Sequence, residues 1–209
     1  MHYIVNDWIV KSEYAAKSQK EPNQFVLDYI SQLPIESCVL DYGCGKLRYA
    51  IPLAERVKQV VAVDSNEQLQ LIYNSSINIA SFNNLRIMSL DSPEWIDSRY
   101  DVVFCTNVLS AIPYESERIQ LLNNAKAVLK PDGHLFLTVQ YHNSYFSQYQ
   151  YRKDTVKCND GWLIQNKSLN RCSFYALLNA DYLTTLCRSV GFNKINVKKK
   201  DGSCFLEAR

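Results

Sequence analysis

Short, uninterrupted apolar runs alternate along this chain with segments in which apolar residues recur every three to four positions. The runs have the length and composition of buried strands, and the segments between them have the spacing of amphipathic helices. Strands are expected at a run that closes with Val39-Leu40 and at residues 60–63, 85–90, 100–105, 135–139, 192–200 and 203–209. Strand and helix alternate over most of the chain, which indicates an α/β fold.

The helical segments have recognisable starts and stops. Residues 22–33 carry apolar side chains at helical spacing, a second helix opens near Tyr49, and Ser65 is an N-cap candidate for a third. A long helix is expected to end at residues 130–133, where the sequence KPDG predicts a helix exit and a turn. The last helix is expected to begin at Asn179.

The segment 37–66 holds the most specific pattern in the chain. A strand, two glycines one residue apart (Gly43 and Gly45), a helix and a second strand follow one another as one βαβ unit. Glycines in such a turn let a ligand approach the backbone closely, although the alternative is that they only make a tight turn. Asp64 lies 21 residues beyond Gly43, the offset of a carboxylate that binds ribose hydroxyls, so a nucleoside is implied.

Charge decides which nucleoside is expected. Asp41, at the end of the first strand, would repel a pyrophosphate, and Arg48 stands where a dinucleotide-binding turn requires glycine or alanine. S-adenosylmethionine (SAM) carries an ammonium and a sulfonium beside its ribose, which suits Asp41 and Asp64 together. SAM is therefore the predicted cofactor.

The stretch VLDYGCGKLRYAIPLAE resembles motif I of the class I SAM-dependent methyltransferases, whose usual form is hhDhGCGxGR, with h apolar. The matching residues are Asp41, Gly43, Cys44, Gly45 and Arg48. Leu47 departs from the motif, because the family's third glycine belongs at this position. We expect this departure to shift the turn or to narrow the methionine pocket.

A second match runs from Tyr100 to Phe136. This block resembles the motif IV to motif V region of the same family, with a strand, a loop of the type NVLxxIP, a long helix and LKPDG. Near the end, Asp201-Gly202 predicts a β-hairpin, which is the characteristic ending of the family. The resemblance covers roughly residues 35–139 and 179–209.

The resemblance implies a single domain over residues 1–209. We expect a seven-stranded, mostly parallel Rossmann-like sheet with helices on both faces and a C-terminal antiparallel hairpin. A helical lead-in at 1–34 precedes the first strand. An insertion at about 141–174 follows the fifth strand and is what the resemblance leaves unexplained.

The predicted cofactor site draws on motif I, the end of the second strand and the loops after the next two strands. Its residues are Asp41, Gly43, Cys44, Gly45, Arg48, Asp64, Ser65, Asp91, Ser92 and Asn107. In the family, a residue at the position of Asp91 or Ser92 often contacts the adenine amino group. The alternative for Asp91 is an N-cap or a turn.

The acceptor is expected at the insertion, which is dense in aromatic residues and leaves the sheet at its carboxyl edge, beside the implied position of the methyl group. His142 is the candidate general base for a hydroxyl or amine acceptor, with a solvated histidine as the alternative. Upstream, the segment with Trp8 and Tyr14 either covers the cofactor as a lid or pads the edge of the sheet. The loop after the fourth strand lacks the [DNS]PP[YFW] motif of DNA amino-methyltransferases and a Pro-Cys nucleophile, so DNA bases are not the expected acceptors.

Composition further limits the kinds of protein and of partner that fit this sequence. With 209 residues there is room for one domain, and a net charge of +2 gives no electrostatic case for a polyanionic partner. Seven cysteines without a CxxC pair or zinc spacing indicate reduced thiols and no metal site. No signal peptide and no membrane span are indicated, so a cytoplasmic protein is expected.

Three functions remain open on the sequence. The first is a SAM-dependent methyltransferase that methylates an oxygen or nitrogen of a small molecule. The second is an RNA or modified-nucleotide methyltransferase, supported only by basic residues of the insertion such as Arg152, Lys153, Lys157, Lys167 and Arg171. The third is a non-catalytic SAM-binding module, suggested by Leu47. The oligomeric state is not predicted.

Overall fold

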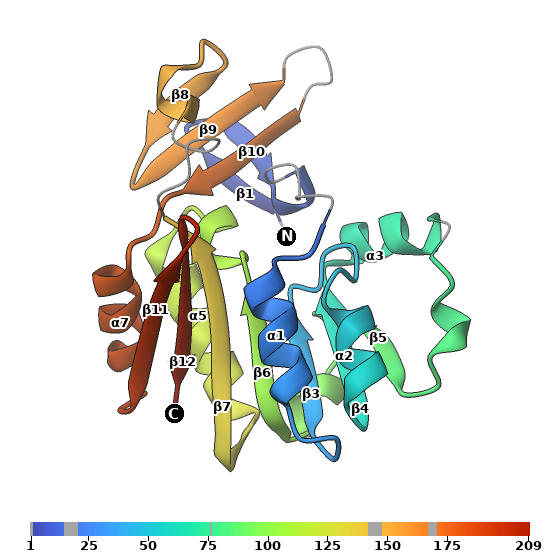
Figure 1. Ribbon diagram of the computed structural model, residues 1–209. Helices are drawn as coiled ribbons and strands as arrows, with labels where there is room; N and C mark the ends of the chain where they lie inside the picture. The colour runs from blue at the N-terminus through green and yellow to red at the C-terminus, as the bar shows by residue number, and fades with distance from the viewer. Residues whose placement is uncertain (1, 15–20, 76, 142–147, 167–170) are drawn as a thin grey trace. The chain divides into compact units, whose positions relative to one another are not determined.

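The computed structural model of residues 1–209 describes residues 2–14, 21–75, 77–141, 148–166 and 171–209 (Figure 1). The strands are β1 (His2–Val5), β2 (Trp8–Lys11), β3 (Cys38–Tyr42), β4 (Gln59–Asp64), β5 (Leu85–Ser89), β6 (Tyr100–Thr106), β7 (Leu129–Gln140), β8 (Thr155–Cys158), β9 (Gly161–Asn166), β10 (Arg171–Ala176), β11 (Ile195–Lys200) and β12 (Ser203–Ala208). The α-helices are α1 (Gln24–Gln32), α2 (Ala50–Arg56), α3 (Asn66–Tyr73), α4 (Glu94–Asp97), α5 (Glu115–Ala127) and α7 (Ala180–Ser189). Short 3-10 helices are η1 (Ser12–Tyr14), η2 (Ile79–Ser81), η3 (Leu109–Ala111) and η4 (Gln148–Tyr151).

A seven-stranded sheet forms the framework, in the order β11-β12-β7-β6-β3-β4-β5. Strand β3 pairs in parallel with β4 and with β6, and β4 pairs in parallel with β5. Strands β11 and β12 form an antiparallel hairpin whose turn residues, Asp201 and Gly202, both have positive φ. The predicted Rossmann-like α/β fold with its closing hairpin is confirmed.

The described residues fall into two compact units. The first, called here the glycine-turn unit, contains Ser18–Thr106 and Asn124–Phe136, and the second, called the insertion unit, contains Met1–Lys17, Asn107–Asn123 and Leu137–Arg209. In the glycine-turn unit α2 packs on β4 and β5, with α1 beside it (Figure 1). Its core includes Tyr29 stacked on Phe136, with ring centroids 4.0 Å apart.

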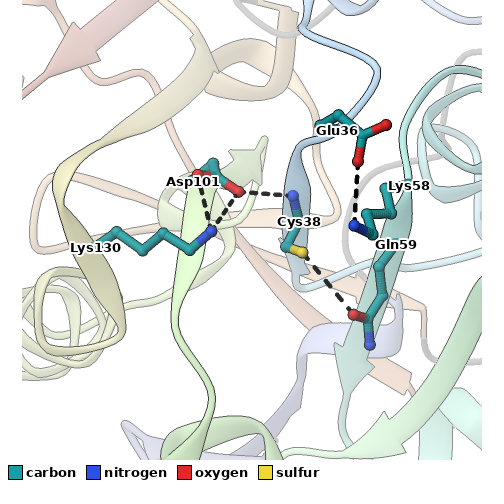
Figure 2. Close-up of polar contacts among 6 residues, drawn as sticks. All are labelled: Glu36, Cys38, Lys58, Gln59, Asp101 and Lys130. Carbon is teal, nitrogen blue, oxygen red and sulfur yellow. Dashed lines mark hydrogen bonds and ion pairs between the residues drawn. The ribbon is translucent and has the colours of Figure 1, made fainter.

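The strands of the glycine-turn unit are tied together at their amino ends, away from the glycine turn (Figure 2). Asp101 accepts a hydrogen bond from the backbone nitrogen of Cys38 at 2.8 Å, and the Lys130 ammonium lies 2.8 and 3.0 Å from its two carboxylate oxygens. These contacts join the starts of β3, β6 and β7. Burial would raise the pKa of Asp101, but the hydrogen bonds from Cys38 and Lys130 outweigh it and hold that pKa below its usual value.

The insertion unit contains two small antiparallel sheets. Strands β8, β9 and β10 form a three-stranded sheet in the order β10-β9-β8, called here the insertion sheet. Strands β1 and β2 form a hairpin, and β2 packs against β10. The expected insertion therefore has regular structure, and the N-terminal hairpin packs on it.

Two local predictions were wrong. The helical lead-in is correct only for α1, because residues 2–11 form the β1–β2 hairpin, where Asn6 and Asp7 adopt the positive φ values of 46° and 65° that its tight turn needs. The turn predicted at 130–133 is instead part of β7. A Cβ on Gly133 would lie 2.8 Å from the carbonyl oxygen of Tyr100, so this glycine serves close strand packing rather than a turn.

Candidate functional site

The turn between β3 and α2 is held in an unusual backbone conformation. Gly43, Gly45 and Leu47 have φ values of 80°, 56° and 60°. The backbone nitrogens of Gly43 and Cys44 donate to the carbonyl oxygen of Val63 at 2.9 and 3.1 Å, which fixes the turn beside the carboxyl end of β4. The predicted glycine turn is therefore present, with left-handed residues at alternate positions.

Asp41 is the most informative side chain in this region. It is 1% exposed, and neither of its carboxyl oxygens has a hydrogen-bond partner among the described residues. Burial, and secondarily the nearby Asp64, raise the pKa of Asp41 to about 7. A buried carboxylate without a partner is costly, so the site fits a ligand that brings a positive charge.

Asp64 is already engaged by the backbone. Its Oδ2 accepts from the nitrogen of Gly45 and its Oδ1 from the nitrogen of Ser65, both at 2.8 Å. Each carboxylate oxygen has a second lone pair, so the predicted ribose hydrogen bonds remain compatible with these contacts. The two backbone bonds fix the direction in which the carboxylate of Asp64 points.

Gln68, on α3, was missed by the sequence prediction. Its amide donates to the carbonyl oxygen of Gly45 at 3.0 Å, and the residue is 5% exposed. Ser65 is the N-cap of α3, as predicted, and its side chain accepts from the nitrogen of Gln68. The available signal was a polar residue on the buried face of α3, beside Leu69 and Ile72.

Leu47 occupies the position of the family's third glycine in this turn. Its φ of 60° is the left-handed conformation that glycine adopts easily and leucine rarely does, and its side chain is completely buried. The strain of roughly 1–2 kcal/mol is comparable with the roughly 1.5–3 kcal/mol that burial of a leucine contributes. The departure from motif I is therefore compensated by packing.

The remaining motif I residues lie beside this turn. The thiol of Cys44 is buried, and burial, with the charges of Asp41 and Asp64, raises its pKa well above the usual value, so it is neutral. Arg48 is half-buried and makes a side-chain hydrogen bond to the hydroxyl of Tyr49. That hydroxyl also accepts from the nitrogen of Asn23 at 3.2 Å, which links the turn to the start of α1.

The other predicted cofactor residues are placed as follows. Asp91 is exposed and accepts a hydrogen bond from the side-chain amide of Asn66, at the start of α3, at 2.9 Å, and its adenine contact stays a prediction. Ser92 is half-buried next to it. Asn107 belongs to the insertion unit, where it has a φ of 60° and donates its backbone N–H to the carbonyl of Thr138 at 2.8 Å. The structure thus brings together Asp41, Gly43, Cys44, Gly45, Arg48, Asp64 and Ser65.

In the insertion unit, the N-terminal hairpin and the insertion sheet share contacts. The Arg171 guanidinium lies over the ring of Tyr14, 4.5 Å from its centroid. Tyr114, which follows η3, donates its hydroxyl to the carbonyl oxygen of Ile4 and packs edge-on against Tyr3. The insertion, predicted to cover the acceptor, and the N-terminal segment, predicted to cover the cofactor or to pad the sheet edge, are therefore parts of one packed unit. His142 lies outside the described residues, so its role as a base stays a prediction.

Three basic side chains in or beside the insertion sheet have partners within the insertion unit. Arg152 pairs with Asp154, and the Lys157 ammonium lies 4.4 Å from the ring centroid of Trp162. Arg171 stacks on Tyr14 as described above. This compensation weakens the only sequence support for a nucleic-acid substrate. Lys167 lies outside the described residues.

Neither a metal-binding cluster nor a membrane-spanning helix is present among the described residues. Within the described ranges, no group of three or more His, Cys, Asp or Glu residues is arranged to hold a metal ion. In the same part of the chain, no helix combines the length and the apolar character needed to cross a membrane.

The sheet order, the glycine turn and the two acids at the ends of β3 and β4 together define a class I methyltransferase fold. A family model described as "Methyltransferase domain" matches residues 14–197. The chain therefore belongs to this methyltransferase family and is a SAM-dependent enzyme of class I.

Individual proteins are also similar to this chain. The uncharacterized protein YmfD of Escherichia coli (strain K12) is 28% identical over 214 residues, covering 99% of this chain and 95% of YmfD. Among solved structures, a SAM-dependent methyltransferase from Methanosarcina mazei is similar with a TM-score of 0.66 and 18% identity, over 90% of this chain and 97% of that one. The DhpI-SAH complex is similar with a TM-score of 0.64 and 15% identity, over 88% of this chain and 81% of that chain. At these identities the two solved structures show the fold alone.

Proposed function

We propose that this protein transfers the methyl group of SAM to an oxygen or nitrogen of a small-molecule acceptor. The observation that carries the cofactor assignment is Asp41, whose buried carboxyl has no hydrogen-bond partner among the described residues. A ligand that brings an ammonium to Asp41 and ribose hydroxyls to Asp64 removes this deficit, and SAM has both groups. No step of the proposal requires a metal ion.

The residues of this chain have separate tasks in the proposed reaction. Asp41 is assigned to the methionine ammonium and Asp64 to the ribose, while the Gly43–Gly45 backbone leaves room for the cofactor. When bound, SAM supplies an activated methyl group for in-line displacement. The protein contributes chiefly by holding the acceptor atom in line with that methyl group, an effect that accounts for much of the rate in such transfers.

Acceptor binding is assigned to the insertion unit. The chain passes into this unit at Asn107, directly after β6, and the insertion sheet and the N-terminal hairpin contribute the aromatic side chains. We retain His142 as the proposed general base. One of the solved structures similar in fold is described as an O-methyltransferase family protein from Burkholderia thailandensis, which is compatible with an oxygen acceptor.

A small molecule is favoured over RNA because three described basic side chains of the insertion have partners of their own. Arg152 is paired with a carboxylate, and Lys157 and Arg171 lie over aromatic rings. A non-catalytic SAM-binding role would rest on Leu47, whose φ of 60° is a conformation that glycine adopts easily, so the substitution alone does not favour that role.

Two experiments test the proposal. Calorimetric titration with SAM asks whether the cofactor binds, and absence of binding by folded protein would remove the assignment. Transfer of labelled methyl groups from SAM into fractionated cell extract then identifies the acceptor class. We expect label in a nuclease-resistant, low-molecular-weight fraction with little dependence on salt. Label in RNA, with binding that falls steeply as salt rises, would support the nucleic-acid alternative instead.

His142 can be tested in the same transfer assay. The variant His142→Ala should lower the rate by roughly 10²-fold and remove the acid limb of the pH–rate profile if the imidazole is the base. An unchanged rate and profile would reassign it to solvent.

A further inference from the structure

Arg118, on α5, has a buried guanidinium group that belongs to no part of the predicted cofactor site. Its side chain is 1% exposed. It forms a bidentate ion pair with Asp160. Its Nη2 donates to Oδ1 at 3.0 Å, and its Nη1 donates to Oδ2. Its Nε also donates to the carbonyl oxygen of Ile112 at 2.9 Å. Few arginines are buried this completely, and the hydrogen bonds are what make the burial tolerable.

The same guanidinium contacts a third element. Its Nη1 donates to the hydroxyl of Tyr182 on α7 at 2.9 Å, and that hydroxyl in turn makes a side-chain hydrogen bond with Glu115. Arg118 therefore joins α5, α7 and the segment that follows η3. The partner from the insertion sheet is Asp160, which lies in the turn between β8 and β9.

The conformation of the β8–β9 turn places Asp160 beside residues 113–118. Asn159 has a φ of 51°, and its amide donates to the carbonyl oxygen of Pro113 at 3.3 Å. At Gly161 a Cβ would lie 2.5 Å from both the Phe174 ring and the Tyr175 carbonyl oxygen, so only glycine fits there. The β8–β9 turn is thus attached to residues 113–118 at two adjacent positions.

The N-terminal hairpin is attached to the same segment. Tyr114 donates its hydroxyl to the carbonyl oxygen of Ile4. Residues 113–118, called here the α5 base, therefore hold both the hairpin and the insertion sheet. One end of the α5 base is rigidly tied to α7 through Arg118.

We propose that Arg118 is a positioning residue, which fixes the insertion sheet on the α5 base through Asp160 so that the sheet holds the acceptor in register for methyl transfer. This inference rests on the proposed function, in which the insertion unit binds the acceptor. A buried ion pair is a poor source of net stability, because desolvation offsets much of the attraction. Such a pair does fix orientation, because a bidentate contact between Arg118 and Asp160 is compatible with only one orientation of the β8–β9 turn.

A cavity beside the ion pair lets small molecules from solution reach the Arg118–Asp160 contact. A volume of about 410 Å³ lies among residues of the α5 base, the β8–β9 turn and the start of α7. The side chain of Asp160 is 41% exposed, whereas that of Arg118 is almost fully covered. Replacing Asp160 by alanine therefore leaves a carboxylate-sized vacancy in front of the guanidinium that a small anion from solution can enter.

The test is chemical rescue of Asp160→Ala by formate, which replaces the carboxylate that alanine lacks. We expect the variant to bind SAM with unchanged affinity but to lose roughly 10²-fold in labelled-methyl transfer to the same extract fraction, because a displacement of about 1 Å has that effect on a positioned reaction. Backbone amides of β8 and β9 should exchange faster with deuterated solvent. Formate, but not chloride at the same ionic strength, should restore both measurements.

Two further variants complete the design. Asp160→Asn keeps one oxygen that can accept a hydrogen bond from Arg118, so its losses of methyl transfer and of exchange protection should be intermediate. This variant replaces Asp160→Ala in the test if the alanine variant does not fold. Asp154→Ala removes the exposed pair with Arg152, just before β8, and should change neither measurement.

Wild-type exchange and transfer in folded Asp160→Ala would overturn the inference. So would a loss of transfer that formate does not restore. If the wild-type protein binds SAM yet transfers no methyl group, the proposed function fails. The exchange and formate measurements then still decide whether Arg118 fixes the sheet.

Discussion

Asp41→Asn should have opposite effects on stability and on cofactor binding: at about pH 8 it should stabilise the ligand-free protein and weaken the binding of SAM. In the ligand-free protein the pKa of Asp41 is raised from 3.8 to about 7, first by burial and then by Asp64. The folded state therefore binds the proton more tightly than the unfolded state does. The stability that this carboxyl contributes is complete below about pH 4, declines as the pH rises from about 4 to 7, and is constant above that.

The magnitude follows from the size of the shift. Each pH unit in this window corresponds to about 1.4 kcal/mol, so ionised Asp41 costs the folded protein at most about 4 kcal/mol above pH 7. Asparagine has nearly the same shape and no charge. The variant should therefore be more stable than the wild type at about pH 8, by up to that amount, and similar to it at about pH 4.

Urea unfolding without cofactor, at several pH values between these limits, measures the difference in the free energy of unfolding between the two proteins. Calorimetry at about pH 8 should show that Asp41→Asn weakens SAM binding by roughly 1.5–3 kcal/mol, the range for a hydrogen bond to a charged group. A variant that is destabilised at every pH would show that ionised Asp41 does not cost the folded protein stability. A variant that binds SAM normally would show that Asp41 is not the partner of the ammonium.

Three other substitutions test neighbouring parts of the account. Gly43→Val should abolish SAM binding in calorimetry, because the φ of 80° and the close approach of the cofactor both exclude a branched side chain; normal affinity would place the cofactor elsewhere. Leu47→Gly restores the family residue but removes a fully buried leucine; the lost burial and the cavity left behind cost roughly 2–5 kcal/mol against roughly 1–2 kcal/mol of relieved strain, so urea unfolding should show a net loss of up to roughly 4 kcal/mol, and a gain in stability would show that strain outweighs packing. Asp101→Asn should cost about 1 kcal/mol or less, because the pair with Lys130 is more than one-third exposed. Since the pKa of Asp101 is lowered on folding, this loss should be present at neutral pH and should disappear as the pH falls below about 4; a loss that persists in acid would contradict the ion-pair explanation.

Much of the framework could be predicted because local signals and long-range packing agree there. The buried strands are apolar runs, and the predicted cap Ser65 and the predicted helix start Asn179 accept hydrogen bonds from the first turns of α3 and α7. Asp64 lies at the end of β4, directly after the apolar run 60–63 that predicted this strand. These features depend on residues that are close together in the sequence.

The missed features depend on contacts between distant residues. Gln68 looks like an ordinary polar position of α3, and only its contact with the Gly45 carbonyl shows its role in the turn. Arg118 and Asp160 are 42 positions apart, and no local pattern distinguishes either from a solvated charge. The β1–β2 hairpin was missed because its turn depends on left-handed Asn6 and Asp7 rather than on glycine.

The most direct test of the central claim is a crystal structure of the protein grown with SAM. The account predicts the methionine ammonium within hydrogen-bond distance of Asp41 and the ribose hydroxyls on Asp64, over the Gly43–Gly45 turn. Density for SAM at any other place, or none at saturating concentration in well-ordered crystals, would contradict it.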